Sequence, residues 1–117
     1  MTRFFLVLTA FLLAGGERFG FSPSDVDSLL KQVAKQKERS ICNRCDLSAA
    51  KLPDIDLSYA DLRGADLSQT NLRNADLRET DLREASLRDA NLSYAILRGA
   101  IFCNTVLPDG EVSNKDC

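Results

Sequence analysis

The sequence predicts an all-β solenoid, and two regularities along most of the chain carry that prediction. Leucine recurs at every fifth position, with phenylalanine replacing it once, and a small residue, usually alanine, stands two positions before most of them. A period of five matches neither the 3.6 of an α-helix nor the 2.0 of a flat strand. A short repeat of fixed period is typical of solenoids. The large residues of the repeat are Leu47, Leu52, Leu57, Leu62, Leu67, Leu72, Leu77, Leu82, Leu87, Leu92, Leu97, Phe102 and Leu107.

The composition excludes several classes of function. The 117 residues include no histidine, which removes Ser-His-Asp and Cys-His catalysis and His-ligated metal sites. With 17 acidic against 15 basic residues, the formal net charge is -2, so the chain lacks the positive field that attracts nucleic acid. We therefore expect no nucleic-acid partner and no cofactor.

Residues 1–16 predict a secretory signal peptide. Arg3 supplies the positive charge, Phe4–Ala14 supply an apolar stretch interrupted only by Thr9, and the small residues at 14–16 offer a cleavage site. The apolar stretch is too short to span a bilayer, which needs about 20 residues. We expect export, and no stable membrane association once the signal has been removed.

Residues 17–44 predict an N-terminal α-helical cap. Ser22 suits the N-cap position, Pro23 the first helical position, and Asp25 the first turn. Apolar residues then recur at helical spacing, with basic residues on the remaining surface. A basic amphipathic helix can also lie on a membrane surface, but its place just before an open solenoid end favours a lid. The apolar stripe is Val26, Leu29, Leu30 and Val33.

Residues 45–109 carry the repeat without interruption. If each leucine points inward, the small residue two positions earlier also points inward, and the residue between them, usually Asp or Asn, points outward. Ala60-Asp61-Leu62-Arg63-Gly64 and Ala65-Asp66-Leu67-Ser68-Gln69 resemble the A-(D/N)-L-x-x consensus of the pentapeptide-repeat family. The resemblance implies a right-handed quadrilateral β-helix with four pentads in each square coil.

This implied geometry places residues twenty apart in register, giving about three coils and a tower roughly 15 Å tall. Leu47, Leu67, Leu87 and Leu107 then form one column of the core. An interior of leucine and alanine leaves no room for a substrate pocket, so we expect a protein that is not an enzyme. The charged residues on the outer walls predict a solvated surface that prevents lateral aggregation.

Four cysteines agree with an exported chain, although four cysteines allow three pairings. In the implied coil geometry Cys103 lies outward on the last coil, where a bridge to Cys117 would tie the tail across that end and leave Cys42 with Cys45. A four-cysteine zinc site needs every sulfur about 2.3 Å from one ion, whereas Cys45 and Cys103 would lie roughly 14 Å apart. A thioredoxin-like motif at Cys42–Cys45 lacks its βαβ context.

Residues 110–117 predict a C-terminal tail cap, after a turn at Pro108-Asp109-Gly110 that breaks the phase of the repeat. The outward position that is polar in most earlier pentads becomes apolar at Ile96, Ile101 and Val106. The favoured interpretation is that the tail folds back over these side chains. The alternative is an exposed patch that contacts a protein partner or a second copy.

The expected function is that of an exported, monomeric, rigid scaffold for contacts with a protein that the sequence does not identify. Cys42–Leu47 and Phe102–Cys117 resemble short cyanobacterial and thylakoid-lumen family members, which implies a periplasmic or thylakoid-lumen location. The family also suggests a DNA mimic that inhibits or protects a type II topoisomerase. Residues 45–109 hold eleven acidic and seven basic side chains, a weak imitation of phosphate.

Overall fold

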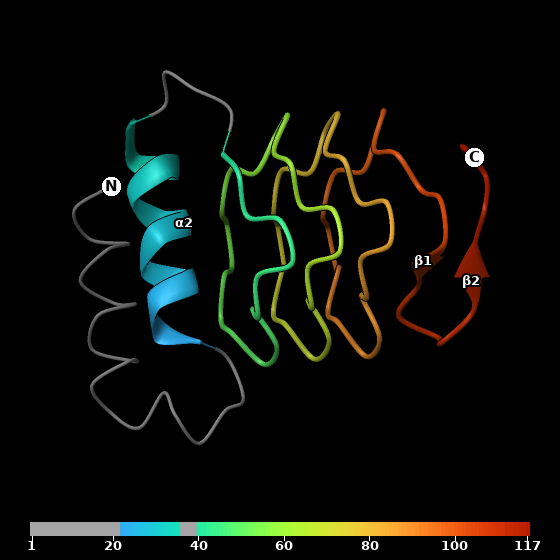
Figure 1. Ribbon diagram of the computed structural model, residues 1–117, viewed down its shortest axis with the longest axis horizontal. Helices are drawn as coiled ribbons and strands as arrows, with labels where there is room; N and C mark the ends of the chain where they lie inside the picture. Colours follow the sequence, from blue (N-terminus) through green and yellow to red (C-terminus); the bar gives the residue numbers. More distant parts are fainter. Residues whose placement is uncertain (1–21, 36–39) are drawn as a thin grey trace.

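A computed structural model describes residues 22–35 and 40–117 of the chain. Helix α2 (Pro23–Lys35) lies at one end of a stack of coils, and two short strands, β1 (Thr105–Val106) and β2 (Val112–Ser113), lie at the other end (Figure 1). The expected signal peptide, residues 1–16, lies outside the described residues. Within the part of the chain that the structure describes, no helix is long and apolar enough to cross a bilayer.

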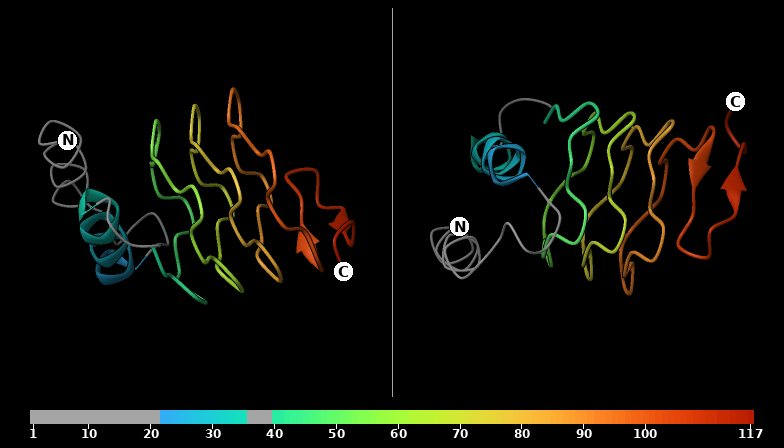
Figure 2. Two further views of the ribbon diagram at one scale, coloured as in Figure 1. Left: turned by 90° about the horizontal axis from the view of Figure 1, so that it is seen from above. Right: turned by 60° about the horizontal axis from the view of Figure 1, so that its bottom comes forward.

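The coils stack with a step of twenty residues. Each isolated β-bridge is parallel and joins positions twenty apart, as between Asp46 and Asp66. The N–H of Leu47 donates to the C=O of Asp66 at 2.8 Å, and the N–H of Leu67 donates to the C=O of Ser86 at 2.7 Å. Leu47, Leu67 and Leu87 therefore follow one another up a single column. Figure 2 shows the parallel courses of the backbone in successive coils.

The walls of the coils are too short for regular strands. Each pentad contributes one bridged residue before the chain turns, so the strands of the described residues are confined to β1 and β2. An all-β fold was expected from the period, and the ladder hydrogen bonds are those of parallel β-structure. The coil is thus β-structure assembled from single residues rather than from strands.

The interior is filled by the large and small residues of the repeat. The leucines from Leu47 to Leu87 are 0% exposed, and most of the alanines between them are as well buried. Thr70, Thr80 and Thr105 occupy the small position in three pentads, and each hydroxyl donates to a leucine C=O 23 residues earlier, at 2.7–2.9 Å. The core can therefore contain threonine, because each buried hydroxyl donates a hydrogen bond to a backbone C=O of the coil.

Each corner is a turn whose third residue has a positive φ. The N–H of Ala50 donates to the C=O of Leu47 at 3.1 Å, and this bond recurs from pentad to pentad. A positive φ at this position is required by a type II turn and is easiest for glycine. Only Gly64 and Gly99 supply glycine there, while eleven non-glycine residues adopt the same conformation: Arg44, Ala49, Asp54, Tyr59, Gln69, Asn74, Glu79, Glu84, Asp89, Tyr94 and Asn104.

The Asp or Asn of the repeat stabilises the same corner from outside. Its side-chain oxygen accepts the N–H two residues later, as from Ser68 to Asp66 at 3.0 Å and from Arg73 to Asn71 at 3.1 Å. Short polar side chains commonly bond to the backbone two residues on. This bond explains why an outward position is nevertheless restricted to Asp or Asn in most pentads.

Helix α2 packs across the first coil through both its ends. The Ser22 hydroxyl accepts the N–H of Asp25 at 3.4 Å, which is the expected N-cap bond. Asp25 in turn accepts the N–H of Asp46 at 2.9 Å, and the amide of Gln32 exchanges two hydrogen bonds with the backbone of Ile41, at 2.6 and 2.9 Å. Its buried residues join the same apolar core as the leucine columns: Val26, Leu29 and Leu30.

The first coil begins before residue 45, where the sequence analysis places the start of the repeat. Ile41 already bridges Asp61, so residues 40–44 belong to the coil rather than to the segment of the helix. The reason is that Cys42 occupies a leucine position and Cys45 a small position, which concealed the pentad. The repeat pattern therefore continues through residues in which neither leucine nor alanine is present.

The C-terminal tail adds a further rung to part of the last coil. β2 pairs antiparallel with β1, with Val106 opposite Val112. The tail lies beyond the last coil along the axis of the tower (Figure 1), so it covers an end and not a side. Ile96 remains 49% exposed, while Ile101 and Val106 are half-buried. The interpretation that the tail folds over all three side chains is thus wrong for Ile96.

Candidate functional site

The cysteines form two pairs at opposite ends of the tower. Cys42 is bonded to Cys45 and Cys103 to Cys117, with Cα–Cα distances of 5.3 and 4.8 Å. Cys42 and Cys45 are part of the core beneath α2, whereas Cys117 is exposed and holds the end of the tail against the last coil. The described residues contain no free cysteine. Each pair joins segments at one end of the tower.

Groups that could perform acid–base or metal chemistry are occupied or dispersed. No group of three or more Cys, Asp or Glu side chains converges on a possible metal position within the described residues. A polar hollow of about 290 Å³ opens at one corner and is lined by Asn43, Arg44, Arg63, Gly64 and Glu84. It is open to solvent on the outer surface, and the carboxylate behind it, that of Asp61, is already bound by Arg63.

Three Asp–Arg pairs cover the walls and correct the expectation of fully solvated charges. Asp61 and Asp81 are only 7% and 3% exposed. Each accepts two hydrogen bonds from the guanidinium of the arginine two positions later and a third from its backbone N–H, and the shortest, from Arg83 to Asp81, is 2.6 Å. The repulsion between the stacked carboxylates of Asp61 and Asp81 is offset because each is bound by the guanidinium of the arginine two positions later. The pair Asp76–Arg78 repeats the arrangement on the next wall.

These bonds change the acidity of the carboxyl groups. Hydrogen bonds from Arg83 hold the pKa of Asp81 below its ordinary 3.8, against the opposing effect of burial, and Arg78 does the same for the pKa of Asp76. A catalytic acid at neutral pH would need its pKa raised instead. The pKa values of Asp76 and Asp81 are therefore shifted away from what proton transfer at neutral pH requires.

One wall gathers exposed large side chains, and we call it the Tyr94 wall. It consists of residues 53–59, 73–79 and 93–99, which are brought together by the bridges from Asp56 to Asp76 and from Asp76 to Ile96. Tyr59 is 63%, Tyr94 77% and Ile96 49% exposed. They are three of the five exposed large hydrophobic residues of the described chain; Ile41 and Val112 lie elsewhere.

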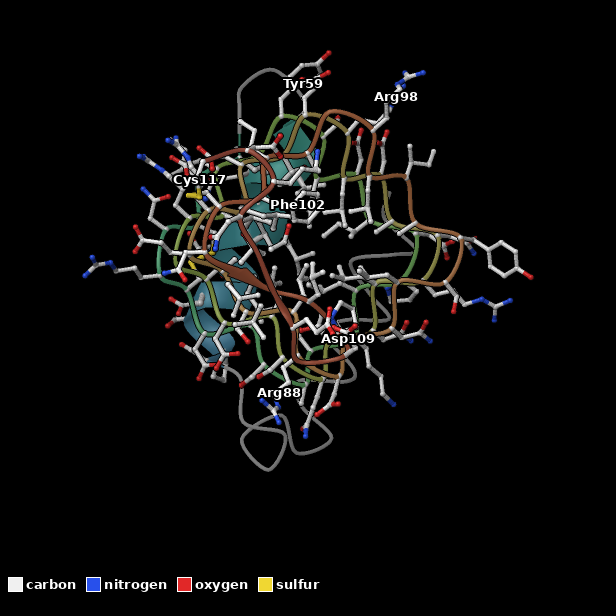
Figure 3. All side chains as sticks on the ribbon, turned by 90° about the vertical axis from the view of Figure 1, so that its right-hand side faces the viewer. Tyr59, Arg88, Arg98, Phe102, Asp109 and Cys117 are labelled. Carbon is white, nitrogen blue, oxygen red and sulfur yellow. A yellow bond between two sulfur atoms is a disulfide. The ribbon has the colours of Figure 1, made fainter. Side chains whose placement is uncertain are left out.

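Arginines accompany the apolar side chains of the Tyr94 wall. The guanidinium of Arg73 lies over the Tyr94 ring, 5.6 Å from its centroid. Arg78 folds onto Asp76, but the residue two before Arg98 is Ile96, which offers no carboxylate. Arg98 makes no ion pair within the described residues, and it extends from the tower at the same corner as Tyr59 (Figure 3). Tyrosine and arginine are the residue types enriched in protein contact surfaces.

The candidate patch of Ile96, Ile101 and Val106 extends over three successive walls, and Val106 is paired with the tail. Sequence reasoning missed Tyr59, Tyr94 and Arg98. The sequence contains the information needed to find them. Applying the twenty-residue step to the positions after each leucine places 54, 74 and 94 at one corner and 59, 79 and 99 at the next corner.

Solved structures of similar proteins come from cyanobacteria and a plant. A pentapeptide-repeat protein from the cyanobacterium Cyanothece 51142 is 37% identical over 57% of this chain, with a TM-score of 0.56; the match spans 46% of that protein. One from Nostoc is 36% identical over 64% of this chain and 73% of its own, with a TM-score of 0.26. One from the thylakoid lumen of Arabidopsis thaliana is 28% identical over 62% and 53%, with a TM-score of 0.32.

The chain thus spans less than half of the Cyanothece protein and about half of the Arabidopsis protein. Among curated protein sequences, none matches this chain significantly. The family model for pentapeptide repeats (8 copies) matches residues 40–78 and 70–108, which together are more than half of the sequence. Together with the twenty-residue step of the coils, this match shows that the chain belongs to the pentapeptide-repeat family, whose members are right-handed quadrilateral β-helices.

Proposed function

We propose that this protein is an exported, monomeric, non-enzymatic scaffold of about three coils whose Tyr94 wall contacts another protein. Pentapeptide-repeat proteins are generally structural or interaction proteins without enzymatic activity. The observation that carries the proposal is the concentration of Tyr59, Tyr94 and Ile96 on one rigid wall beside three arginines. Exposed apolar groups gathered in this way mark interaction surfaces on otherwise polar proteins.

The ends of the tower support the same proposal. An uncovered coil end would expose the leucine columns and unpaired backbone, and would invite non-specific association. We assign α2 the role of N-terminal cap because it buries Val26, Leu29 and Leu30 over the first coil. With one end occupied in this way, the Tyr94 wall carries three of the five exposed large hydrophobic residues of the described chain.

Export is the second part of the proposal. Two disulfides in a chain of this size are typical of an oxidising compartment such as the periplasm or the thylakoid lumen. The expected signal peptide at residues 1–16 agrees with this location. The sequence of the mature N-terminus, determined by Edman degradation of protein purified from the host, tests it: a mature chain that still begins at Met1 contradicts export through a cleaved signal.

A photo-crosslinking amino acid at a single position tests the contact surface. Tyr94 is replaced by benzoylphenylalanine in the host cell, and Gln69, an exposed corner residue on another wall, is replaced in a control. We expect a discrete crosslinked protein from position 94 and not from position 69. The crosslinked protein is then purified, and its binding in solution should be lost in Ile96→Asp. Equal crosslinking from both positions contradicts a specific wall.

A further inference from the structure

The two disulfides of the tower differ in how far a reagent can reach them. Cys42 is 2% exposed and belongs to the core that α2 joins, and Cys45 is half-buried beside it. Cys117 is exposed, and it lies at the end of the tower that faces the viewer in Figure 3. Disulfide exchange requires a thiolate to approach one sulfur of the bond, so access governs which bond reacts. The Cys103–Cys117 bond is therefore the more accessible of the two.

The bonds also differ in what keeps their two sulfurs together once the bond is opened. The N–H of Cys45 donates to the C=O of Cys42 at 3.3 Å, and the C=O of Cys45 accepts the N–H of Asp66 in the next coil at 2.9 Å. These bonds hold the first pair in one corner of the coil, so its thiols would remain neighbours. The N–H of Cys117 donates to the C=O of Asn114, at 3.3 Å, within the tail itself. That bond does not hold Cys117 to the last coil.

The segment that the second disulfide secures covers Phe102. The N–H of Phe102 donates to the carboxylate of Asp116 at 2.9 Å, and the N–H of Asp116 donates to the C=O of Phe102 at 2.8 Å. The ammonium group of Lys115 lies 5.6 Å from the centroid of the Phe102 ring. The N–H of Asn104 donates to the side chain of Asn114 at 2.8 Å. Residues 114–117 therefore cover one large core side chain, which is 9% exposed, and pair two backbone donors of the last coil.

The strands hold a different part of the tail. β2 pairs with β1 over two residues of each strand, from Thr105 opposite Ser113 to Val106 opposite Val112. A two-stranded pairing is at best marginally stable in water by itself, and this one ends at residue 113, before the segment that covers the last coil. The disulfide secures that segment. Opening the disulfide therefore favours release of residues 114–117.

We propose that Cys103–Cys117 is a redox latch, which a dithiol reductant opens while Cys42–Cys45 remains oxidised. In the open state residues 114–117 leave the last coil, and Phe102 becomes exposed at that end of the tower. The oxidation state of one bond thus controls the exposure of one apolar side chain and of two backbone donors. This inference goes beyond the proposed function, because it depends on the disulfides and the tail and not on the Tyr94 wall.

The reaction is an ordinary thiol–disulfide exchange. A thiolate of the reductant attacks Sγ of Cys117, a mixed disulfide forms, and Cys103 leaves as a thiolate that takes up a proton. The second thiol of the reductant then attacks its own sulfur in the mixed disulfide and displaces Cys117, which is protonated in turn. Two electrons and two protons pass from the dithiol to the two cysteines, and the reductant is left as a disulfide.

A redox titration of the folded protein tests the latch. The protein is equilibrated in buffers of increasing ratio of reduced to oxidised dithiothreitol, free thiols are alkylated after an acid quench, and the labelled cysteines are identified by peptide mass spectrometry. We expect Cys103 and Cys117 to be labelled at a ratio at least about tenfold lower than Cys42 and Cys45. At the ratio that opens the first bond alone, amide exchange at Phe102 should be faster by about tenfold or more.

Two double variants serve as matched controls. Cys103→Ala/Cys117→Ala should show the faster exchange at Phe102 without reductant and no further change with it, whereas Cys42→Ala/Cys45→Ala should keep the response to reductant. Labelling of both pairs within the same tenfold range of ratio, or of Cys42 and Cys45 first, would overturn the proposal. Unchanged exchange at Phe102 in the wild-type protein after its second disulfide has opened would overturn it as well. Both of these outcomes are read from the wild-type protein, so they do not depend on the folding of either variant.

Discussion

At the scale of single residues, the corners of the coil depend on an unusual backbone conformation. Eleven non-glycine residues have φ between 52° and 62°, where L-residues are disfavoured by about 1–2 kcal/mol each. The ladder hydrogen bonds and the buried leucines around each corner hold these residues in place. The third residue of the turn was therefore not identifiable from composition, because the repeat tolerates Arg, Tyr, Gln or Glu where isolated turns prefer glycine.

Glycine exchange at two corners tests this strain. Gln69→Gly relieves a positive φ and removes an exposed side chain, so we expect the free energy of unfolding to rise by about 0.5–1 kcal/mol. Gly64→Ala should lower it by about 1–2 kcal/mol, because its φ is +70° and a Cβ would lie 2.9 Å from Cγ of Arg44. Urea denaturation measures both. A fall in the free energy of unfolding for Gln69→Gly, or a rise for Gly64→Ala, would refute the interpretation.

The Asp–Arg pairs predict how stability depends on pH. The pKa values of Asp76 and Asp81 are lowered in the folded protein, so both carboxylates stabilise it above the unfolded value near 3.8 and lose that contribution as pH falls below it. We expect Tm to fall steeply below about pH 4. Asp81→Asn retains the acceptor for the N–H of Arg83 but not the charge, so its loss of Tm in acid should be shallower. Parallel curves for the two proteins would exclude this contribution.

At the scale of elements, the two disulfides should differ in their effect. Cys103–Cys117 closes a loop with a sequence separation of 14, and Cys42–Cys45 one with a separation of 3. In the chain-entropy model the longer loop is worth about 3 kcal/mol and the shorter about 1.9 kcal/mol. Replacing Cys103 and Cys117 by alanine should therefore lower stability and also expose the amides of Phe102 and Leu107 to exchange.

The Cys103/Cys117 double variant is compared with the wild-type protein by calorimetry and hydrogen exchange. Unchanged protection at Phe102 and Leu107 would mean that the β1–β2 pairing holds the tail without the disulfide. The N–H groups of Leu72 and Leu77 provide internal controls, because they donate to Asn91 and Ile96 and not to the tail.

Helix α2 makes a separate prediction about the first coil. Leu29 is 0% exposed in the core shared with the leucine columns, so Leu29→Ala should cost about 2–5 kcal/mol. Ser28→Ala, at the neighbouring exposed position, is the matched control and should change stability by less than about 0.5 kcal/mol. Thermal denaturation compares them. A cost below about 1 kcal/mol for Leu29→Ala would show that α2 does not cap the coil.

The sequence predicted the start of the helix and the leucine columns. The start of the first coil and the path of the tail were not predicted, for physical reasons. Ser22, Pro23 and Asp25 predicted where α2 begins, and the leucine period predicted the columns. The start of the first coil was missed because a disulfide fills the space of a leucine and an alanine. The path of the tail was missed because residues 110–117 carry no periodic pattern, and their position is set by backbone pairing with β1.

At the scale of the whole molecule, the tower is asymmetric. α2 packs against the core at one end, β2 of the tail pairs with β1 at the other, and Tyr59 and Tyr94 are exposed on the Tyr94 wall. The sequence predicted a scaffold without a pocket, but the Tyr94 wall was missed because it emerges only when the corner residues of successive coils are compared with one another. That juxtaposition follows from the twenty-residue step and not from any neighbouring residues in the chain.

The most direct test of the central claim is a set of methyl–methyl nuclear Overhauser contacts from Leu67 in the disulfide-bonded protein. A square coil of twenty residues places Leu67 between Leu47 and Leu87, so its methyl groups should give cross-peaks to both. Contacts from Leu67 to Leu52 and Leu82 in place of these would indicate three pentads per coil. That result would contradict both the packing of the core and the composition of the Tyr94 wall.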